Sequence, residues 1–429
     1  MNVLVIGSGG REHAICRSFR KSKTVGRLFC ANGNAGIAEI AERVDIRPDE
    51  ISSLLAFALE NSIDLTFVGG ETPLALGVVD EFEANGLRII GPRQAAARLE
   101  ASKSFAKDFM ARHNVATARY LTARGAGSAV DSLRSGYFGG ADKPVVIKAD
   151  GLAAGKGVVV AADRTQAIAA VNDLESLVGA AAAQTIVIEE CLTGPEVSLL
   201  MFADGDDFAL MPATRDHKRI GEGDTGPNTG GMGTITDDSL LTPTELDLII
   251  DTIVRATLAG GIKEGFPFRG ILFLGLMMTP DGPKLLEYNV RFGDPETQAI
   301  LVRLDSDIVE ICDAMLNGTL GQIKVEWRSG SSACVVLAAS GYPSKPTAGD
   351  AINGLAEANA IPGIEIFHAG TALDDSGNYV TAGGRVLAIT AAGPDLSTSL
   401  RTVYSAVDMI TWPGMQFRRD IGAMAARTT

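Results

Sequence analysis

Two lysines and a glycine-rich run mark residues 144–160, which read PVVIKADGLAAGKGVVV. Lys148 ends an apolar run of β-branched residues, Lys156 lies among the glycines, and a second apolar run begins at Val158. This order predicts a strand, a loop and a second strand. Glycines let the backbone approach a ligand closely, and backbone N–H groups beside two ammonium groups suit a polyphosphate. A plain hairpin turn is the structural alternative.

This loop differs from the P-loop of many nucleoside triphosphatases. A P-loop has four residues between its glycines, followed by Gly-Lys and a hydroxyl residue. Here three residues separate Gly151 from Gly155, and Gly157 takes the place of the hydroxyl residue. The predicted order of elements also leaves no helix N-terminus beside the phosphates. A phosphate site in this segment must therefore use lysines and backbone N–H groups.

A second set of polar residues lies at 287–298, EYNVRFGDPETQ. Glu287 and Asn289 point to the same face of a strand, because side chains alternate along it. A carboxylate and an amide oxygen on one face can hold Mg²⁺, with water and phosphate oxygens completing its octahedron. Arg291 continues this face if the strand persists, and its charge could stabilise a transferring phosphoryl group. An edge strand with outward polar residues is the structural alternative.

The first turn of the chain, GSGGREH, follows an apolar run and resembles a dinucleotide-binding fingerprint. Glu12 replaces the third glycine, and the next expected strand ends in Ala-Asn where a ribose-binding acid is needed. These departures argue against a dinucleotide cofactor. A helix N-terminus beside Gly9, Gly10 and Arg11 still suits a phosphate monoester. A tight strand-to-helix turn is the structural alternative.

Three acidic residues and a long loop follow in the middle of the chain. Glu189 and Glu190 directly follow an expected strand at 185–188, and Glu196 comes after a turn. These side chains could bind an adenine amine and ribose hydroxyls, or they could form a solvated edge. Residues 216–233 hold six glycines and almost no hydrophobic side chains, so they cannot form a core. Loops of this length are usually functional or disordered, and well-patterned elements on both sides favour function.

These groups need elements that position them. In the first hundred residues apolar runs alternate with helical patterns, which predicts a parallel sheet with helices on its faces. Ligands bind beyond the carboxyl ends of the strands in such sheets, where glycines follow nearly every apolar run. The expected strands are 3–6, 28–30, 65–68 and 87–90, and the expected helices are 13–22, 49–60 and 73–84.

The rest of the chain shows other patterns. A helix is expected at 101–112, with Lys103 near its start, and the sequence TPTE at 242–245 combines a capping box with proline at the first helical position. A solvated surface charge is the ordinary interpretation of Lys103. From residue 331, short strands and one helix predict a small α+β domain. Further strands are expected at 271–278, 284–287, 333–338, 364–368 and 385–390.

Length and composition limit the possible classes of function. The chain has 429 residues, which suggests roughly three domains. It has 52 acidic and 38 basic residues and a net charge of −14, which argues against a nucleic-acid or anionic-membrane partner. The opening MNVLVIG lacks the basic start of a signal peptide and no apolar run is long enough to span a membrane, so a cytoplasmic protein is expected. Five cysteines without a CxxC pair indicate free thiols.

Taken together, four stretches resemble the ATP-grasp superfamily and, within it, the phosphoribosylamine–glycine ligase family. They are GSGGREHA, VIKADGLAAGKGV, HKRIGEGDTGPNTGGMG and RFGDPETQ, and they occur in the family's order. FHAGT and RRDIG near the C-terminal end also look like family elements. The resemblance implies a multidomain α/β and α+β fold, with an N-terminal open parallel α/β sheet, a central ATP-grasp fold and a small C-terminal α+β domain.

The resemblance also implies domain boundaries and an activity. The N-terminal substrate-binding domain would span 1–101, the ATP-grasp domain 102–295 with a lid at about 122–190, a helical connection 296–330 and the C-terminal domain 331–429. ATP would phosphorylate glycine to glycyl phosphate, which the amine of 5-phosphoribosylamine then attacks. The products would be N1-(5-phosphoribosyl)glycinamide, ADP and phosphate, in de novo purine biosynthesis.

The implied cofactors are ATP and Mg²⁺ or Mn²⁺. The implied partners are the small-molecule substrates glycine and 5-phosphoribosylamine, without nucleic acid or membrane, and the oligomeric state is left open, with a monomer as one alternative. A glycine-rich lid at 154–158 would keep water away from the acyl phosphate, which hydrolyses easily.

The family's motifs imply a role for individual residues of this chain. The catalytic residues would be Arg291, Lys148 and Asp216. The ATP-binding residues would be Lys103, Lys148, Gly155, Lys156, Gly157, Glu189, Glu190 and Glu196. The metal ligands would be Glu287 and Asn289. The substrate-binding residues would be Gly9, Gly10, Arg11, Glu12, Asp216, Lys218, Asn228, Arg291 and Asp294.

Two departures from the family pattern and two alternative functions accompany these expectations. The strand expected at 271–278 carries no carboxylate for the metal, and TITD at 234–237 replaces the family's usual aromatic and proline-rich run. One alternative is another ATP-grasp carboxylate–amine ligase with a different acceptor. A distant alternative is a dinucleotide-dependent oxidoreductase, which only the first turn suggests.

Overall fold

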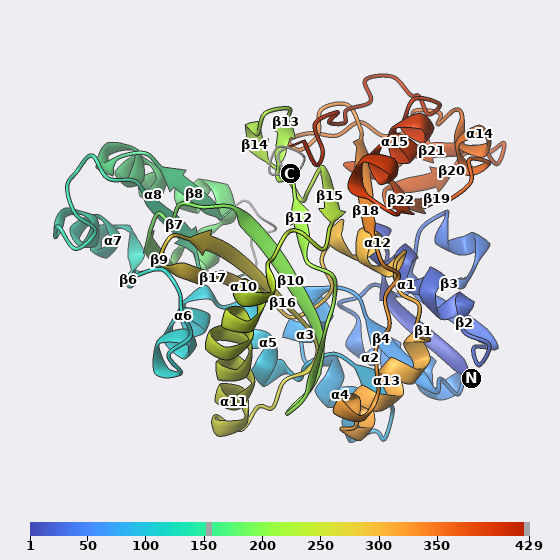
Figure 1. The fold of residues 1–429 in the computed structure, drawn as a ribbon, viewed down its shortest axis with the longest axis horizontal. Coiled ribbons are helices and arrows are strands. Elements are labelled where there is room, and N and C mark those ends of the chain that lie inside the picture. Colours follow the sequence, from blue (N-terminus) through green and yellow to red (C-terminus); the bar gives the residue numbers. More distant parts are fainter. Residues whose placement is uncertain (152–156, 424–429) are drawn as a thin grey trace.

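The computed structural model describes residues 1–151 and 157–423 of the chain (Figure 1). Gly155 and Lys156, two of the expected ATP-binding residues, therefore lie outside the described residues. In the described part, no helix combines the length and the apolar character that a membrane crossing requires.

The first hundred residues form a five-stranded sheet in the order β3-β2-β1-β4-β5. Every pairing in it is parallel, and β1 and β4 are almost wholly buried because helices cover both faces. The parallel sheet expected from the sequence is thus confirmed. The strands are β1 (Asn2–Gly7), β2 (Arg27–Asn32), β3 (Glu42–Val44), β4 (Leu65–Val68) and β5 (Ile89–Ile90).

The helices of this region differ from expectation, since η1 and α5 were not expected and one expected helix is divided. The single helix expected at 73–84 is wrong, because Gly77 takes a left-handed φ of 86° and separates two helices there. The short strand β3 was not expected, since its three residues are only partly buried and form no apolar run. The helices are α1 (Gly10–Lys21), η1 (Ile37–Glu39), α2 (Ile51–Glu60), α3 (Glu71–Ala75), α4 (Val78–Ala84) and α5 (Gln94–Ala101).

A four-stranded antiparallel sheet in the order β6-β9-β7-β8 forms a separate lobe, at the left of Figure 1. Its apolar side chains pack with two helices into a core of their own. The strand, loop and strand expected around Lys148 are β7, the segment that contains the undescribed residues, and β8. The elements are α6 (Lys103–Arg112), β6 (Tyr120–Arg124), α7 (Gly125–Arg134), β7 (Val145–Ala149), β8 (Val158–Ala161), α8 (Arg164–Val178), α9 (Ala180–Ala183) and β9 (Thr185–Glu190).

A nine-stranded sheet joins the centre of the chain to its C-terminal part. Its order is β17-β16-β10-β12-β15-β18-β22-β19, and β11 pairs with β10. The expected C-terminal strands are present, and they continue the central sheet because β18 pairs with β15. The strands are β10 (Glu196–Asp204), β11 (Phe208–Leu210), β12 (Thr214–Asp216), β15 (Gly233–Thr236), β16 (Arg269–Thr279), β17 (Gly282–Asn289), β18 (Ser331–Ala338), β19 (Ile364–His368) and β22 (Arg385–Gly393).

The sequence suggested an irregular loop between β12 and β15, but part of this segment is regular. It contains a small hairpin of β13 (Arg219–Gly221) and β14 (Thr225–Asn228). Asp224 takes a left-handed φ of 55° in the turn between them. The hairpin is exposed along β14. Its sequence lacks the alternation of apolar and polar residues that predicts a strand.

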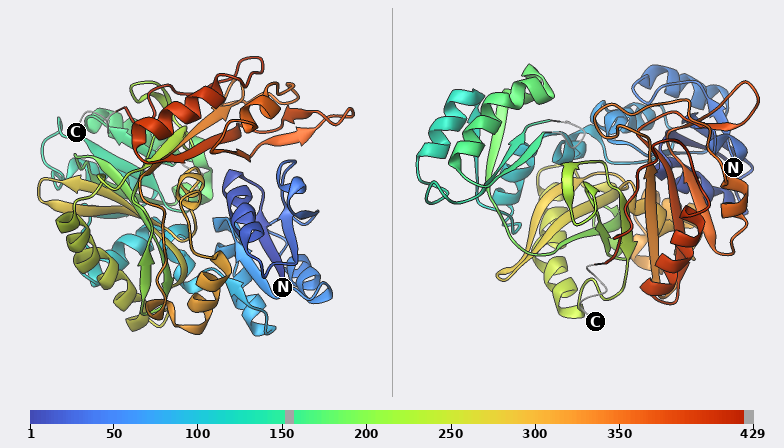
Figure 2. Two further views of the ribbon diagram at one scale, coloured as in Figure 1. Left: turned by 45° about the vertical axis from the view of Figure 1, so that its right-hand side comes forward. Right: turned by 90° about the horizontal axis from the view of Figure 1, so that it is seen from above.

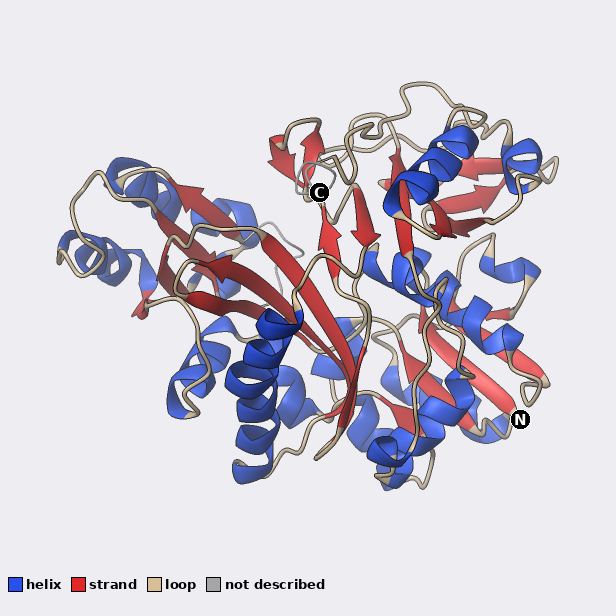
Figure 3. Cartoon of the chain, viewed as in Figure 1, coloured by secondary structure: helices blue, strands red, loops and turns tan. Residues whose placement is uncertain are grey.

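The remaining helices cover the central sheet and connect it to the C-terminal part (Figure 3). The helix start expected at 242–245 is confirmed, because the Thr242 hydroxyl accepts the Glu245 N–H at 3.2 Å and the Glu245 carboxylate accepts the Thr242 N–H at 2.8 Å. The helices are α10 (Pro243–Ile249), η2 (Ile250–Val254), α11 (Arg255–Lys263), α12 (Glu296–Leu301), α13 (Ile308–Asn317), η3 (Leu320–Gln322), α14 (Leu355–Asn359) and α15 (Leu396–Val407).

The C-terminal part lies against the N-terminal sheet, as the left view of Figure 2 shows. Helix α1 contacts both α12 and β19, so residues from the two ends of the chain meet beside the first turn. The short hairpin of β20 (Thr371–Leu373) and β21 (Tyr379–Thr381) lies in the same C-terminal part. This packing places the carboxyl ends of β1 and β2 next to C-terminal residues.

Candidate active site

The charges of three lysines from different elements act on the Glu287 carboxylate. Lys103 begins α6, Lys148 lies on β7, and Lys218 follows β12. Burial opposes ionisation of Glu287, but the ammonium groups of Lys148, Lys218 and Lys103 outweigh it and lower the pKa of this carboxyl. Glu287 is therefore an anion at neutral pH, the state in which a carboxyl group binds a metal. The structure brings together four of the expected site residues here.

Lys103 is held at the start of the glycine-rich segment. Its ammonium donates to the Gly151 carbonyl at 2.9 Å, and burial lowers its pKa. The Asp150 carboxylate accepts from the Ser104 N–H at 3.2 Å and from the Ser104 hydroxyl at 2.7 Å. The first turn of α6 and the start of the segment are thus tied together. At its other described end, the Gly157 carbonyl accepts from Ala149 N–H at 2.8 Å, so Gly157 closes the segment beside β7.

Glu189 lies between two lysines, one of which the sequence had not singled out. Its Oε1 lies 2.7 Å from the Lys148 ammonium and its Oε2 lies 2.7 Å from the Lys107 ammonium. All three side chains are buried, with exposed fractions of 8 %, 2 % and 3 % for Lys148, Glu189 and Lys107. Lys107 follows Lys103 by four positions, so both lie on one face of α6. That spacing is the signal by which Lys107 could have been found.

The other two acids expected at the nucleotide make ion pairs as well. The Glu190 carboxylate accepts from the Arg119 N–H at 2.9 Å and from its guanidinium at 2.8 Å. Glu196, at the start of β10, lies 2.7 Å from the Lys218 ammonium. Contact of these acids, or of Glu189, with adenine or ribose stays a prediction.

Glu287 and Asn289 share one face of β17, opposite Gly275 and Phe273 of β16. The irregularity in this pairing falls before Glu287, so the alternation between the two residues is regular. Residue 275 is glycine, so no side chain there covers Glu287. A Cβ at this position would lie 3.4 Å from Glu287 Cγ. Among the described residues no group of three or more His, Cys, Asp or Glu side chains could hold a metal. A metal at Glu287 and Asn289 would therefore need most of its ligands from water and phosphate, which fits Mg²⁺.

Arg291 lies beyond the end of β17, because the strand ends at Asn289. Its guanidinium instead lies 2.7 Å from Glu100 and 3.2 Å from Glu71, and it donates to Asn289 Oδ1 at 3.2 Å. Glu100 also accepts the Val290 N–H at 2.8 Å, which fixes it at the end of the strand. Arg291 is thus held rigidly beside the candidate metal ligand Asn289.

Two carboxyl groups, those of Asp216 and Glu296, lie close to each other near Lys218. Asp216 is buried, and its carboxylate lies 3.9 Å from the Lys218 ammonium. Burial and the neighbouring Asp216 raise the pKa of Glu296 to about 7, and burial also raises the pKa of Asp216. A side chain at position 293 would collide with Glu296 Oε2, so Gly293 is needed for this arrangement. Glu296 was not expected at the site, although it belongs to the same motif as Arg291.

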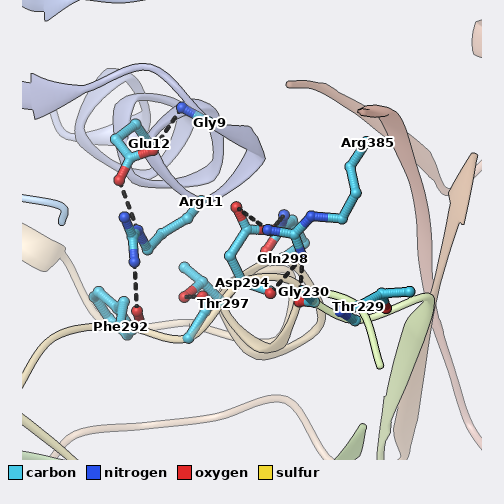
Figure 4. Close-up of polar contacts among 12 residues, drawn as sticks. Gly9, Arg11, Glu12, Thr229, Gly230, Phe292, Asp294, Thr297, Gln298 and Arg385 are labelled. Carbon is cyan, nitrogen blue, oxygen red and sulfur yellow. Dashed lines mark hydrogen bonds and ion pairs between the residues drawn. The ribbon is translucent and has the colours of Figure 1, made fainter. Parts of the chain in front are cut away.

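The first turn is closed by its own side chains (Figure 4). The Gly9 N–H donates to Glu12 Oε2 at 2.6 Å, and Arg11 Nε donates to Glu12 Oε1 at 2.6 Å. Arg11 also donates to the Phe292 carbonyl at 3.0 Å. Glu12 therefore occupies part of the α1 N-terminus at which a phosphate was expected. Phosphate binding by Gly9, Gly10 and Arg11 stays a prediction.

Asp294 and Arg385 join three parts of the chain beside this turn (Figure 4). Arg385, from β22, donates to the carbonyls of Gly230 at 2.5 Å and Asp294 at 2.6 Å, and lies 3.4 Å from the Asp294 carboxylate. Gln298 donates to the same carboxylate at 2.9 Å. Burial opposes ionisation of Asp294, but Arg385 and Arg11 lower the pKa of its carboxyl. Arg385 was not expected at the site, because the sequence of its own domain indicates no chemistry.

The hairpin that follows Lys218 is anchored by the C-terminal segment. Arg418 is buried and lies 2.7 Å from both Asp224 and Asp420, and it donates to the Arg219 carbonyl at 3.1 Å. This gives the C-terminal RRDIG stretch a structural role. Asn228, at the end of β14, is exposed, and its contact with a substrate stays a prediction.

A cavity of about 470 Å³ lies at the carboxyl ends of β1 and β2, against the C-terminal part. Its lining includes Ser8, Asn34, Arg43, Gly370 and Thr371. A Cβ on Gly10 would lie 3.8 Å from the Cβ of Ala369, another lining residue, so the cavity adjoins the first turn. In open parallel sheets this edge is where ligands bind.

Comparison with known proteins agrees with this geometry. The family model for the N domain of phosphoribosylglycinamide synthetase matches residues 1–100, the one for its ATP-grasp (A) domain matches 101–297, and the one for its C domain matches 332–424. A phosphoribosylamine–glycine ligase of Brucella melitensis is 45 % identical over 423 residues, covering 98 % of this chain and 97 % of that protein. One of Yersinia pestis is 46 % identical over 431 residues, covering 99 % of each.

Solved structures show the same likeness. The phosphoribosylamine–glycine ligase of Thermotoga maritima is 34 % identical, with a TM-score of 0.83 that covers 98 % of this chain and 100 % of that one. A biotin carboxylase of Campylobacter jejuni is 16 % identical with a TM-score of 0.72, covering 97 % of this chain and 92 % of that one, which shows a shared fold. The described sheets, the converging lysines and the three matched domain models agree, and the chain belongs to the phosphoribosylglycinamide synthetase family.

Proposed function

We propose that this chain joins glycine to 5-phosphoribosylamine at the expense of ATP and releases ADP and phosphate. The observation that carries the proposal is the convergence of Lys103, Lys148 and Lys218 on the ionised Glu287, in a chain that matches phosphoribosylamine–glycine ligases along its whole length. Ammonium groups and a carboxylate gathered in one site suit a nucleoside triphosphate with its divalent cation.

The chemistry requires an activated glycine. A carboxylate oxygen of glycine attacks the γ-phosphorus of ATP, the bond to the β-phosphate oxygen breaks, and ADP leaves. The amine nitrogen of phosphoribosylamine then attacks the carbonyl carbon of glycyl phosphate, and phosphate leaves while the nitrogen loses a proton. Both steps place negative charge on phosphate oxygens, which fixed cations stabilise without reorganisation.

Individual residues take the following proposed roles. Lys103 and Lys148 bind phosphate oxygens of ATP, and Glu287 with Asn289 would hold Mg²⁺ or Mn²⁺. When bound, the metal ion offsets charge on the phosphate oxygens. Arg291 is held by Glu100 and Glu71 within 3.2 Å, so its charge is oriented before the substrate arrives.

The acceptor amine is proposed to bind at the edge of the N-terminal sheet. This edge carries Gly9 to Glu12, with Asp294 and the cavity of about 470 Å³ beside them. Residues from the N-terminal sheet and from the C-terminal part line the cavity. Asp294 is ionised next to Arg385 and Arg11, so it can accept hydrogen bonds from an amine. Asp216 and Lys218 lie 3.9 Å apart, Lys218 acts on Glu287, and both are proposed to orient glycine.

Nucleotide contacts are proposed for Glu189, Glu190 and Glu196. The domain boundaries at 101/102, 295/296 and 330/331 and a cytoplasmic location are further proposals that the reaction itself does not require.

The test measures ADP release with ATP, Mg²⁺, glycine and phosphoribosylamine, omitting each substrate in turn. We expect sustained ADP release with all substrates present and one glycinamide ribonucleotide for each ADP. Lys148→Met should lower this rate by about a hundredfold, whereas Lys143→Met, an exposed lysine of the same lobe, should retain it. Equal turnover with another amine in place of phosphoribosylamine would favour a ligase with a different acceptor. Lack of ADP release under all conditions would refute the proposed reaction.

A further inference from the structure

Lys107 is a buried cation on the inner face of α6. Its ammonium lies 2.7 Å from Glu189 Oε2 and donates to the Thr117 hydroxyl at 2.7 Å. The Thr117 hydroxyl in turn donates to the Leu285 carbonyl at 2.6 Å, two residues before Glu287. Lys107 is therefore fixed between β9 and β17. Burial lowers its pKa to about 8, at which most molecules still carry the charge at neutral pH.

The neighbouring carboxylate is shared between two cations. Glu189 Oε1 faces the Lys148 ammonium at 2.7 Å, and Lys148 also donates to the Leu286 carbonyl at 3.3 Å. The two lysines meet different oxygens of Glu189 and come from different elements, so either can leave without disturbing the other pair. A buried carboxylate that loses its last counter-ion is strongly destabilised. Because Lys107 stays paired with Glu189, Lys148 can move away without leaving the buried carboxylate unpaired.

We propose that Lys107 is a positioning residue that keeps Glu189 paired, so that Lys148 can turn from Glu189 to the phosphate oxygens of the nucleotide. The proposal rests on the role given above to Lys148. Without Lys107, Lys148 is the remaining cation within ion-pair distance of Glu189 among the described residues. Lys148 then stays with the carboxylate, and the nucleotide phosphates compete with Glu189 for it.

Calorimetric titration with MgATP, in the absence of glycine, measures this effect without turnover. Lys107→Met should weaken MgATP binding by about tenfold to a hundredfold. Lys263→Met, an exposed lysine at the end of α11, serves as the matched control and should bind MgATP like the unmodified chain. Unchanged affinity of Lys107→Met would overturn the proposal.

A second background separates positioning from a structural role. In Glu189→Gln there is no carboxylate to hold Lys148, so adding Lys107→Met should change the affinity for MgATP less than about threefold. A loss of more than about threefold from Glu189→Gln to the double variant would overturn the proposal. This comparison remains valid if Lys107→Met alone does not fold, because both of its variants lack the unpaired buried carboxylate.

Lys148→Met distinguishes this inference from the proposed function. If Lys148→Met leaves MgATP affinity unchanged, the nucleotide role of Lys148 is wrong, and this inference falls with it. If Lys148→Met weakens binding while Lys107→Met does not, the nucleotide role stands and the positioning role of Lys107 is refuted.

Discussion

Acidification should loosen the contact between the two ends of the chain, because two buried histidines meet there. The backbone N–H of His368 donates to His13 Nδ1 at 2.9 Å, and the Asn34 side chain donates to the His368 carbonyl at 2.7 Å. Burial, with the neighbouring His368, lowers the pKa of His13 from its ordinary value of 6.5 to about 3. Protonation of Nδ1 would also abolish the hydrogen bond that it accepts.

The size of the effect follows from this shift in pKa. A histidine with a lowered pKa in the folded state contributes stability that is present above its ordinary pKa of 6.5 and is lost as the pH falls toward about 3. Each pH unit in that window costs about 1.4 kcal/mol, so His13 accounts for a loss of roughly 2 kcal/mol at about pH 5. Burial lowers the pKa of His368 to about 4, so it adds a loss in the same direction.

The assay compares His13→Asn with the unmodified chain at about pH 7.5 and pH 5. Asparagine retains an oxygen that can accept the His368 N–H but does not become charged at these pH values. Hydrogen exchange of the amides of α1 and β19 reports opening of this contact, and urea unfolding reports total stability. We expect the unmodified chain to lose roughly 2 kcal/mol more than the variant on acidification. Equal losses in both proteins would refute the assignment of His13 as a buried neutral histidine.

Three further predictions concern the site. Glu287→Gln should lower ADP release by about a hundredfold at saturating Mg²⁺, because the metal loses its anionic ligand; near-normal turnover there would contradict this role. Arg11→Met should raise the KM for phosphoribosylamine more than the KM for ATP, and the reverse order would place the nucleotide at the first turn. Burial raises the pKa of Glu296 to about 7, so its contribution to stability is present below its ordinary pKa of 4.5 and is lost as the pH rises through about 7. Glu296→Gln should therefore gain up to about 3 kcal/mol of stability over the unmodified chain between about pH 5 and pH 8.5, measured by urea unfolding, and a constant difference would contradict this.

Where the sequence misled, a local signal was missing or had a second meaning. The short strands β13 and β14 have no apolar alternation, and the helix break at Gly77 falls inside a continuous helical pattern. Arg291 was expected to extend the face of β17 if the strand persisted. The strand ends at Asn289, two carboxylates hold the guanidinium, and Arg291 still donates to Asn289 Oδ1 at 3.2 Å. The C-terminal strands were recognised as strands, while their pairing to β15 depends on a strand about a hundred positions earlier in the chain.

The sequence by itself determined the features that depend on near neighbours. The alternation of side chains places Glu287 and Asn289 on one face of a strand, and the capping box starts a helix at Thr242, because both effects act within a few residues. Only the tertiary structure decided which charges meet. The pairing of Glu189 with both Lys148 and Lys107 requires a strand pairing and a helix packed against it, and no periodicity along the chain encodes that distance. Electrostatic energy depends on separation in space, so the roles of these buried ions follow from packing.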